Sequence, residues 1–530
     1  MKSRTLRLLA ILLALAFFAT ACGGESDGDS DTSSTDNPVD DPVDDPVDDP
    51  VDDPVDDPVD GEPNIYDDPR DGIFDEFQAT YDRGSHPFTQ VDAVCLPHDA
   101  AENRVDSGSG ISADEVNIGH IRSRLEDAVS LGFGIPVGDP KEMFEVFVDY
   151  VNSECDGIRG RQVNLGYVEA DLLGADVEAS RNQACLAMTE DHNSVIVMNS
   201  SGFQGSANLC IVEEQETSFI STQGQTEEFM ARGEDRLISL SMTLEESLRF
   251  MANDLIQSGA LDGHSLGTAS PNTPGQAEAV EEGLVNTLRD AGFDIVFDVI
   301  DCQGGSICSG GVPQSVTNMA DADVDVFFNV MNILTAPGYI AEMVAQGYEP
   351  GDVQFYATDF NSQTSELVSG QIANNIEAGE LYNGAIIIDF RTTGEYRNEG
   401  YEPNPFAAEC NRVYTENNPS GNTHEWNDEG DSAYGMVGSV CSILRIAFRA
   451  IYDAGENPTV EEIQNALANL GPIDNNALAP ASIRPGKTQS ADVIQTLDYS
   501  FPCDLPLPFT RSSGDPICIT GREDFRPAPR

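Results

Sequence analysis

The chain has 530 residues, and its 92 Asp and Glu against 27 Lys and Arg give a formal net charge of −65 at pH 7. So acidic a chain is not expected to bind nucleic acid, which needs a basic protein surface. The length predicts two or three domains, and the 40% of hydrophobic residues is enough to build their cores.

The first 21 residues have the pattern of an export signal. Three basic residues among the first seven precede an apolar run at 8–18, which is too short to cross a membrane, and small residues follow it. Cys22 comes next and resembles a bacterial lipobox cysteine, although Ala19 stands where Leu is more usual. We therefore expect a signal peptide at 1–21 and a lipid anchor at Cys22 on the extracytoplasmic face of a bacterial cell membrane. An ordinary secretory signal before a chance cysteine is the alternative.

Residues 22–61 are expected to be a spacer. From Asp36 to Gly61 the order Asp-Pro-Val-Asp repeats every four residues. Proline in each repeat is incompatible with helix and sheet, and neighbouring aspartates repel each other, so we expect an extended, acidic, disordered tether. Residues 62–112 are assigned to an N-terminal extension without chemistry of its own.

From about residue 113, short apolar runs alternate with amphipathic segments. In the first half, strands are predicted at 116–121, 163–168, 195–198 and 217–220, with helices beginning at Asp139-Pro140 and over 177–188. In the second half, strands are predicted at 266–269, 294–300, 324–328 and 353–357, and helices at 244–257, 280–288, 336–345, 431–453 and 460–470. This alternation predicts an α/β fold of parallel sheets with helices on both faces.

The segment from Ser194 to Gly224 has the order strand, helix, strand, so its two strands must be parallel. Their carboxyl ends therefore lie on one edge of the sheet, which is where open α/β sheets bind ligands. Both strands end in hydroxyl residues, and we expect Ser200, Ser201 and Thr222 to line one wall of a small-molecule cleft. The alternative is that these residues only form turns and helix caps.

Ten of the eleven cysteines remain once Cys22 is set aside. An even number in an exported chain favours disulfides, although order alone does not decide the pairing. The pairs favoured by proximity, or because they would secure the β-α-β unit and a late helix, are Cys302–Cys308, Cys503–Cys518, Cys185–Cys210 and Cys410–Cys441. With no Cys-x-x-Cys motif and six scattered His, we expect neither a metal site nor a cofactor.

Six motifs, weak singly but fairly specific in order and spacing, stand at Val116–Gly119, Phe147–Asn152, Gly157–Arg161, Val195–Ser201, Phe219–Thr222 and Ala433-Tyr434. Together, over roughly residues 113 to 480, they resemble the type I periplasmic solute-binding proteins of ABC transporters, especially the branched-chain amino acid and amide branch. The resemblance implies two α/β lobes, joined by hinge crossovers, that close around a solute. The expected lobes are 113–242 with 361–480, and 243–360 with 481–530.

The resemblance also implies roles for particular residues. Ser200, Ser201 and Thr222 would bind the carboxylate of an amino-acid-like ligand, aided by helix N-termini that favour anions. Asp359 would either meet the ammonium group or remain a solvated loop carboxylate. Three polar residues of the second lobe would close over the ligand: Asn272, Thr273 and Asn332.

Two departures from the family pattern leave the identity of the ligand open. Met198-Asn199 replaces the usual Gly-Pro before the first hydroxyl turn, and the loop after the first strand is long, from Arg122 to Gly138. In that loop Arg122 or Arg124 would either grip a carboxylate bidentately or balance nearby Asp and Glu.

We therefore expect a lipid-anchored, extracytoplasmic protein that is not an enzyme and that delivers a small polar solute, an amino acid or amide, to an ABC permease. A sensor that serves a signalling partner through the same cleft is an alternative that the sequence does not separate from transport. A serine esterase is a third possibility, because Gly263-His264-Ser265-Leu266-Gly267 matches the motif G-x-S-x-G. That motif needs a strand before the serine and a helix after it, whereas Ser265 follows a predicted helix and opens a strand, so we disfavour it.

Overall fold

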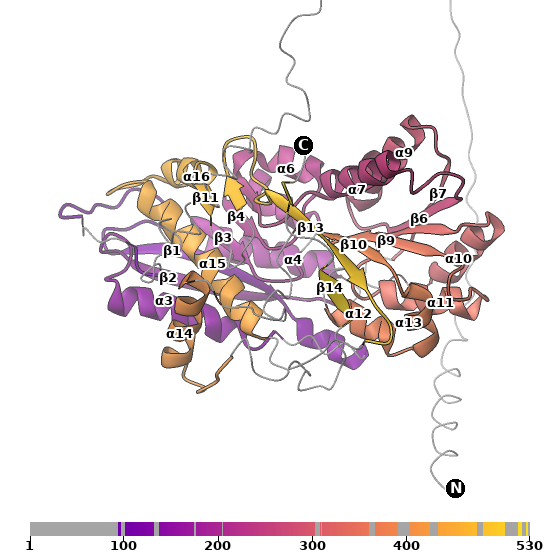
Figure 1. The fold of residues 1–530 in the computed structure, drawn as a ribbon. Helices are drawn as coiled ribbons and strands as arrows, with labels where there is room; N and C mark the ends of the chain where they lie inside the picture. Colours follow the sequence, from indigo (N-terminus) through magenta and orange to yellow (C-terminus); the bar gives the residue numbers. More distant parts are fainter. Residues whose placement is uncertain are drawn as a thin grey trace, which may run out of the picture. The chain divides into compact units, whose positions relative to one another are not determined.

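The computed structural model describes residues 94–96, 101–131, 137–173, 176–203, 205–302, 308, 310–359, 366–390, 403, 405–424, 433–473, 481–503, 518–521 and 526–527. The predicted signal peptide, Cys22, the tether and most of the N-terminal extension lie outside these residues. The described part forms two α/β lobes, each built on its own sheet (Figure 1).

The sheet of the first lobe has five parallel strands in the order β2-β1-β3-β4-β5. They are β1 (Glu115–Ser123), β2 (Gln162–Ala170), β3 (Ile196–Asn199), β4 (Ser218–Ser221) and β5 (Leu237–Ser239). The sequence predicts the first four, whereas β5 is too short to carry a periodic signal. Asn199 at the end of β3 lies opposite Ser221 at the end of β4, so these two strand ends lie side by side, as predicted.

Helices cover both faces of this sheet because successive strand residues point to opposite sides. Ile196 and Met198 of β3 belong to one apolar core, and Val197 belongs to the other. The first core is covered by α3 (Pro140–Glu154), α14 (Pro405–Asn417), α15 (Ala433–Asp453) and α16 (Val460–Ala468). The second is covered by α4 (Val177–Leu186), η3 (Ala187–Asp191), α5 (Ala207–Leu209), η4 (Cys210–Glu214) and α6 (Glu227–Gly233).

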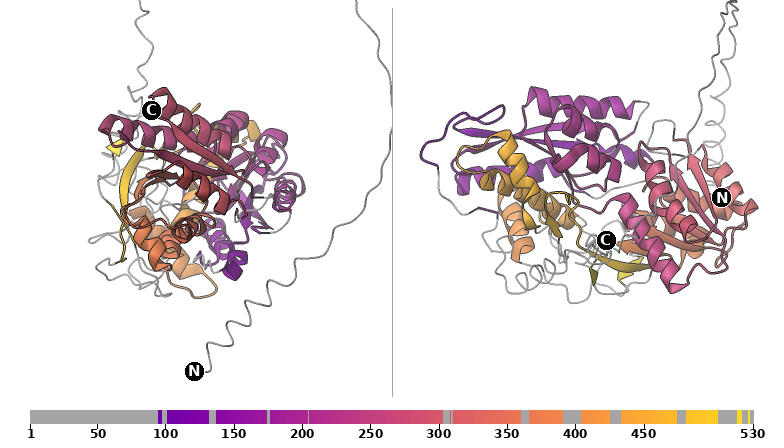
Figure 2. Two further views of the ribbon diagram at one scale, coloured as in Figure 1. Left: turned by 90° about the vertical axis from the view of Figure 1, so that its right-hand side faces the viewer. Right: turned by 90° about the horizontal axis from the view of Figure 1, so that it is seen from above.

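Late segments of the chain thus complete the first lobe, and in Figure 2 the orange helices lie beside the indigo and purple elements. The longest of them, α15, is long and apolar enough to cross a membrane, but 78% of its most apolar window is buried in the protein. It packs against α3 and α16 as a core helix. At the start of α3, the Asp139 carboxylate accepts the amide of Glu142 at 3.1 Å and Pro140 occupies the first turn, as predicted.

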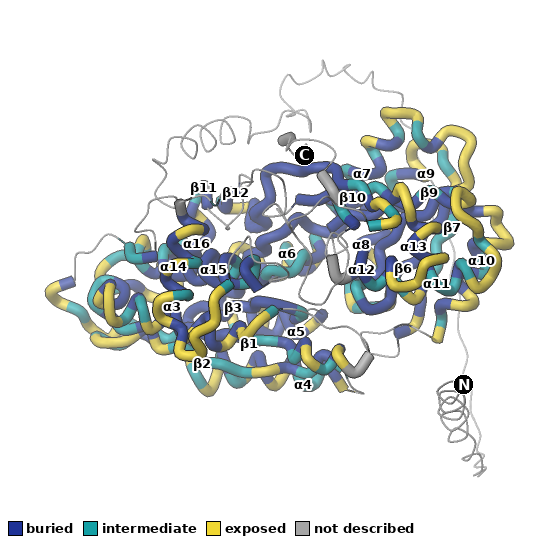
Figure 3. The backbone as a smooth tube through the Cα atoms, turned by 60° about the horizontal axis from the view of Figure 1, so that its bottom comes forward, coloured by how far each residue is buried: buried dark blue, intermediate teal, exposed yellow. Residues whose placement is uncertain are grey.

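The second lobe repeats the strand order of the first, with parallel strands in the order β7-β6-β8-β9-β10. They are β6 (Leu266–Pro271), β7 (Ile295–Ile300), β8 (Val326–Asn329), β9 (Gln354–Thr358) and β10 (Ile386–Asp389). One face carries α7 (Leu244–Ser258), α8 (Gln276–Val280), η6 (Glu281–Asn286) and α9 (Thr287–Asp290), and the other carries α10 (Val312–Asp321), α11 (Ala336–Ala345), α12 (Glu366–Ala373) and α13 (Ile376–Tyr382). The strands are mostly buried, and exposed residues gather on outer helices and turns (Figure 3).

The C-terminal strands differ from the purely parallel arrangement that the sequence predicts. β13 (Val493–Tyr499) runs antiparallel to β10, and both β14 (Ile519–Gly521) and β15 (Arg526–Pro527) run antiparallel to β13. The second sheet is therefore mixed, because the chain returns to its edge from the other lobe by a short connection instead of a helical crossover.

The lobe boundaries also differ from the expected ones. Residues 361–480 were all expected in the first lobe, but α12 and α13 pack in the core of the second, and β10, which was not predicted as a strand, pairs with β9. Both faces of its Ile-rich run are buried there. β12 (Ala481–Ile483) was expected in the second lobe, but it pairs with β11 (Gly471–Ile473) and packs in the core of the first. Each of these segments lies beside the apolar surface that buries it, which local sequence does not indicate.

Five disulfides stabilise the described chain, and all four favoured pairings are among them: Cys185–Cys210, Cys302–Cys308, Cys410–Cys441 and Cys503–Cys518. The fifth joins Cys95 to Cys155 at the end of α3, across 60 residues. It was not predicted, because the two cysteines are distant in sequence, and it ties the N-terminal extension to the first lobe. Closing so long a loop restricts the unfolded chain.

Two connections between the lobes, residues 240–243 and 484–492, run side by side. Ser239 donates its amide to the Thr488 carbonyl at 2.9 Å and accepts the Ser490 amide at 2.8 Å. Beside them, Lys487 and Asp492 form an ion pair of 3.1 Å, with both side chains 2% exposed. The ammonium also donates to the carbonyls of Ser482, Gln489 and Ser490, which compensates part of the cost of burying it.

A buried carboxyl group also lies at this junction. Glu245, in the first turn of α7, is 2% exposed, and its Oε2 accepts the amide of Glu227 at 3.0 Å. Arg249 donates to both carboxylate oxygens of Glu227, at 3.1 and 3.0 Å. Burial raises the pKa of Glu245 to about 7, because the charged form loses its hydration.

Truncation of the buried ammonium should destabilise the protein strongly. We expect Lys487→Ala to lower the free energy of unfolding by about 3–5 kcal/mol, because Asp492 is then left buried without its counter-ion. Lys141→Ala is the control, since Lys141 pairs at 3.7 Å with Glu145 and both side chains are about half exposed, so its loss should cost less than about 1 kcal/mol. Urea unfolding measures the free energy of unfolding of both variants. Equal losses of stability would contradict a structural role for the Lys487–Asp492 ion pair.

Replacement of Glu245 should stabilise the protein at high pH. Between the unfolded pKa of 4.5 and the folded value of about 7, the folded state binds more protons, so Glu245 makes stability fall as pH rises through this window. Glu245→Gln keeps an acceptor oxygen for the Glu227 amide, and we expect it to raise the free energy of unfolding by about 1–3 kcal/mol at pH 8 and by much less at pH 4.5. Urea unfolding at both pH values checks this, with exposed Glu145→Gln as control; a gain of equal size at both pH values would refute the buried, protonated carboxyl.

Candidate functional site

The candidate site lies at the carboxyl ends of the strands of the first lobe. With the order β2-β1-β3-β4-β5, the chain leaves β1 over one face of the sheet and leaves β3 over the other. A crevice opens between two such strand ends, and ligands of sheets with this order bind there. Ser200 follows β3 at this point, and its Oγ lies 3.0 Å from Nε2 of His120 on β1.

Hydrogen bonds fasten the turn after β3 to the neighbouring strands. The amide nitrogen of the Asn199 side chain donates to the carbonyls of Ile121 and Ser201, each at 3.0 Å. The Ser123 amide reaches the Ser201 carbonyl at 3.4 Å, and the Thr222 hydroxyl reaches the Asn199 carbonyl at 3.4 Å. Ser200, Ser201 and Thr222 are therefore gathered at one edge, as predicted.

Several buried polar atoms at this edge have no hydrogen-bond partner among the described residues. They are Oγ of Ser123, Oδ1 of Asn199 and Oγ of Ser201. Buried polar atoms are nearly always paired, and an unpaired one costs about 1–3 kcal/mol. A group of them at a sheet edge that favours ligand binding is what a site for a polar molecule requires.

His120 is a site residue that sequence reasoning missed. It is fully buried, its ring stacks on Phe144 at 3.7 Å between centroids, and burial lowers its pKa to about 3, with Arg122 adding to the effect. The ring is therefore neutral at physiological pH. The available signal was a titratable ring inside the mostly apolar strand 116–121, whose other polar residue is Asn117.

The arginines near the site are already paired. Arg122 contacts Glu126 and, at 3.0 Å, Glu169, and Arg124 contacts Asp127 and Asp171. The sequence leaves two roles open for Arg122: gripping a ligand carboxylate or balancing nearby Asp and Glu. In the structure Arg122 balances nearby carboxylates. The strand-end residues themselves are neutral hydroxyls and amides.

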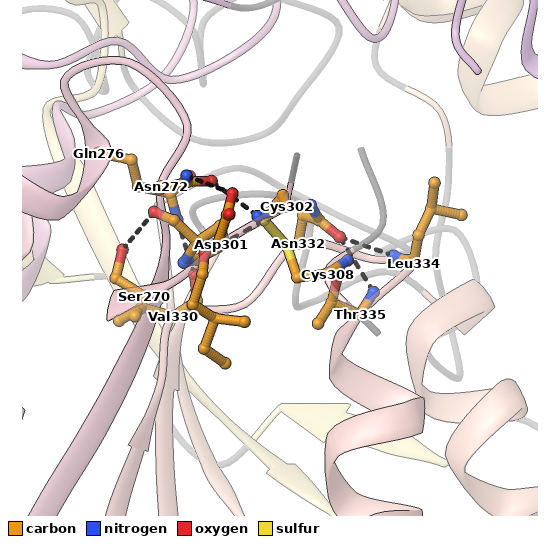
Figure 4. The surroundings of a disulfide bond; sticks show 12 residues. Ser270, Asn272, Gln276, Asp301, Cys302, Cys308, Val330, Asn332, Leu334 and Thr335 are labelled. Atoms are coloured by element: carbon orange, nitrogen blue, oxygen red, sulfur yellow. Dashed lines mark hydrogen bonds between the residues drawn. A yellow bond between two sulfur atoms is a disulfide. The ribbon is translucent and has the colours of Figure 1, made fainter. Parts of the chain in front are cut away.

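Two of the second-lobe residues expected over the ligand are engaged in turns (Figure 4). The Asn272 side chain donates to Asp301 at 2.9 Å and accepts the Cys302 amide at 2.8 Å, which secures the Cys302–Cys308 disulfide. Oδ1 of Asn332 accepts the amides of Leu334 and Thr335, at 3.1 and 3.0 Å, before α11. These bonds give both residues a structural role.

The remaining second-lobe candidates differ in exposure. Thr273 is half-buried in the loop after β6. Asp359 follows β9 and is fully buried, with its amide donating to the Ile388 carbonyl at 2.8 Å. It is thus not the solvated loop carboxylate that was the alternative for it.

The lobes also touch through apolar side chains. Leu125 and Ala128, in η2 (Leu125–Leu131) after β1, pack with Leu172 after β2 and with Leu334 of the second lobe. This small core includes part of the long first-strand loop that departs from the family pattern.

The geometry around Ser265 does not form a nucleophile elbow. Ser265 precedes β6, and its amide donates to Asp325 at 2.8 Å. His264 contacts the same carboxylate at 3.1 Å. The serine therefore lies at the amino end of a strand, whereas an elbow places it at the carboxyl end.

No family model matches the chain, and no curated protein matches its sequence. Several solved structures, however, are similar to this chain. A solute binding protein of an ABC transporter from Rhodopseudomonas palustris, in complex with 3,4-dihydroxy benzoic acid, is 12% identical with a TM-score of 0.54, over 78% of this chain and 98% of that chain. A fatty acid ABC transporter substrate-binding protein from Thermomonospora curvata is 14% identical with a TM-score of 0.54, over 80% and 95%. A possible leucine/isoleucine/valine-binding protein from Rhodopirellula baltica is 13% identical with a TM-score of 0.53, over 80% and 98%.

These likenesses establish the class of fold. The chain has the two-lobed fold of the type I periplasmic binding proteins, with helix-flanked sheets joined by hinge crossovers. The expectation from the six sequence motifs is thereby confirmed for the fold, which is what similarity at 12–14% identity shows.

Proposed function

We propose that this protein is an extracytoplasmic solute-binding protein that captures a small carboxylate-bearing molecule between its lobes and delivers it to an ABC permease. The observation that carries the proposal is the group of buried, unpaired hydroxyl and amide atoms at the switch point of the first sheet, among the residues that the structure describes. A polar ligand would supply the missing partners, and closure of the lobes would shield these bonds from water. Binding and release need no covalent step, so the proposal does not make the protein an enzyme.

A carboxylate is the ligand group that this chemistry suits. Ser200, Ser201 and Thr222 are the proposed contacts, because hydroxyls donate to an anion without introducing a charge. Thr222 would exchange its long contact of 3.4 Å with the Asn199 carbonyl for one with the ligand. The benzoic acid, fatty acid and amino acids named for the similar structures all carry a carboxylate. Asp359 is proposed to select for a positively charged group on the ligand, which would favour amino acids over other acids. Asn272, Asn332 and Arg122 are left out because their side chains are engaged within the protein.

The proposal also includes a lipid anchor at Cys22, supported by the small residues before it and by the Pro-rich acidic tether after it. Each buried methylene of an acyl chain contributes about 0.8 kcal/mol to membrane binding, so two or more chains hold a protein at the surface. The tether would let the folded lobes reach a permease in the same membrane.

A thermal-shift panel tests ligand capture. We expect one of L-leucine, 4-hydroxybenzoate or octanoate to raise the melting temperature, since a ligand at 100 times its Kd stabilises the native state by about 2.7 kcal/mol. The matched control is the corresponding amide, which lacks the negative charge and should shift the melting temperature less. A panel of amino, aromatic and fatty acids without any shift would contradict the proposed function.

The double variant Ser200→Ala, Thr222→Ala tests the site. Loss of two hydroxyl donors to an anion should weaken binding of the panel acid about 10- to 100-fold, measured below the melting temperature of the variant, which should fall because the buried His120 ring loses its partner. Ser265→Ala is the control, because it removes a hydroxyl far along the chain at the amino end of β6. Calorimetric titration measures both, and unchanged affinity in the double variant would place the site elsewhere.

Cys22→Ser tests the anchor. In a bacterial host that processes lipoproteins, we expect the variant to move from the membrane fraction to the soluble extracytoplasmic fraction, because acylation needs the cysteine thiol. Ser26→Ala, which keeps Cys22, is the control and should stay with the membrane. Membrane association of the Cys22 variant equal to wild type would exclude this anchor.

A further inference from the structure

His120 stands out from its surroundings because it is a polar residue in an apolar position. It lies on β1, is fully buried, stacks on Phe144 with an angle of 16° between the rings, and lies 5.5 Å from the Tyr167 ring. An apolar side chain would satisfy this packing. The one polar contact of the ring is Nε2 to Ser200 Oγ, at 3.0 Å, among the described residues.

The neutral ring carries one N–H, and its position follows from the partners of the two nitrogens. Nδ1 of His120 is buried and has no hydrogen-bond partner in the described part of the chain. If Nδ1 carried the hydrogen, a buried N–H donor would be left unpaired, which is rarer in proteins than an unpaired acceptor. With the hydrogen on Nε2, the N–H is satisfied by Ser200 and only a lone pair is unpaired. The contacts therefore favour the Nε2–H tautomer.

The tautomer of His120 decides whether the Ser200 hydroxyl donates or accepts in the hydrogen bond between them. A serine hydroxyl has one hydrogen to donate and rotates to suit its partners. If His120 donates to Ser200 Oγ, the hydroxyl hydrogen of Ser200 is not used in that bond, and no other described residue accepts it. It is then available to a ligand, next to Ser201, whose buried Oγ is also unpaired among the described residues.

We infer that His120 is a positioning residue for ligand binding: it donates Nε2–H to Ser200 and so directs the Ser200 hydroxyl hydrogen toward an acceptor oxygen of the ligand. The inference rests on the proposed function and deepens it. It makes Ser200 a fixed donor, which selects a carboxylate or another acceptor group over an amine or ammonium at this point of the site. The opposite tautomer would consume the hydroxyl hydrogen and make Ser200 an acceptor.

The tautomer can be measured on the full-length chain without any ligand. In long-range ¹H–¹⁵N spectra of protein labelled with ¹⁵N-histidine, the ring of His120 is assigned by its contact with Phe144. We expect a protonated Nε2 and an unprotonated Nδ1, unchanged from pH 5.5 to 8. A protonated Nδ1, or an imidazolium in this range, would overturn the inference.

Two variants test the consequence for binding. His120→Gln places an amide N–H near the position of Nε2, whereas His120→Phe keeps the stacked ring and removes the donor. With the acid of the panel that gives the largest shift (L-leucine, 4-hydroxybenzoate or octanoate), we expect about a tenfold loss of affinity for His120→Phe and less than a threefold loss for His120→Gln. Equal losses in both variants, or no loss in either, would contradict a positioning role.

These experiments separate the inference from the proposed function. If the panel acids bind and the tautomer is the opposite one, the inference fails while the solute-binding function stands. If no acid binds, the proposed function fails whatever the tautomer is, and the inference fails with it. Circular dichroism of both variants confirms that they fold before affinities are compared.

Discussion

The parallel pairing of β1 with β2 on one side and with β3 on the other is the constraint on which the candidate site depends. Because the chain leaves β1 and β3 over opposite faces, no single connection covers the edge between them. A side chain near the end of β1 meets one that follows β3 there, as the contact between His120 and Ser200 shows. The second lobe has the same strand order, so its corresponding edge lies between β6 and β8.

The chemistry of this edge contrasts with the composition of the chain. A protein with a formal net charge of −65 has a neutral set of hydroxyl and amide groups at the switch point of its first sheet. The arginines nearest to it are held by local carboxylates, as in the contacts of Arg122 with Glu126 and Glu169. Selectivity in such a site comes from the direction in which each hydroxyl donates. The partner of each hydroxyl therefore matters more than the net charge around it.

The junction between the lobes combines rigid and adjustable elements. Backbone hydrogen bonds between Ser239 and the segment 488–490 hold the two connections together, and the Lys487–Asp492 ion pair lies beside them, fully enclosed. Away from the junction, contact between the lobes includes apolar side chains such as Leu125 and Leu334. Apolar contacts are non-directional, so separation of the lobes there, which the proposed function requires, would leave the hydrogen-bonded connections intact.

Much of the fold could be predicted from local sequence. Apolar runs with β-branched residues define β3 and β4, and Asp139 and Pro140 define the start of α3, because strand period and helix capping are properties of a few consecutive residues. The same logic placed Ser200 beside Thr222, since two parallel strands joined by one helix must end at the same edge. The short strands β5, β11, β12, β14 and β15 could not be predicted in this way, because their conformation comes from the strands beside them, and β10 and the longer β13 were not predicted either.

The amino-acid sequence by itself determined the alternation of strands and helices, the parallel β3–β4 unit and the hydroxyl residues that follow it. Only the tertiary structure decided that β10 belongs to the second lobe, that Cys95 pairs with Cys155, and that His120 meets Ser200. The last two contacts join residues 60 and 80 positions apart, and no periodic pattern in the chain encodes them. They depend on which surfaces pack together once the sheets have formed. Burial of apolar area drives this packing, and it does not depend on how far apart two residues are in the sequence.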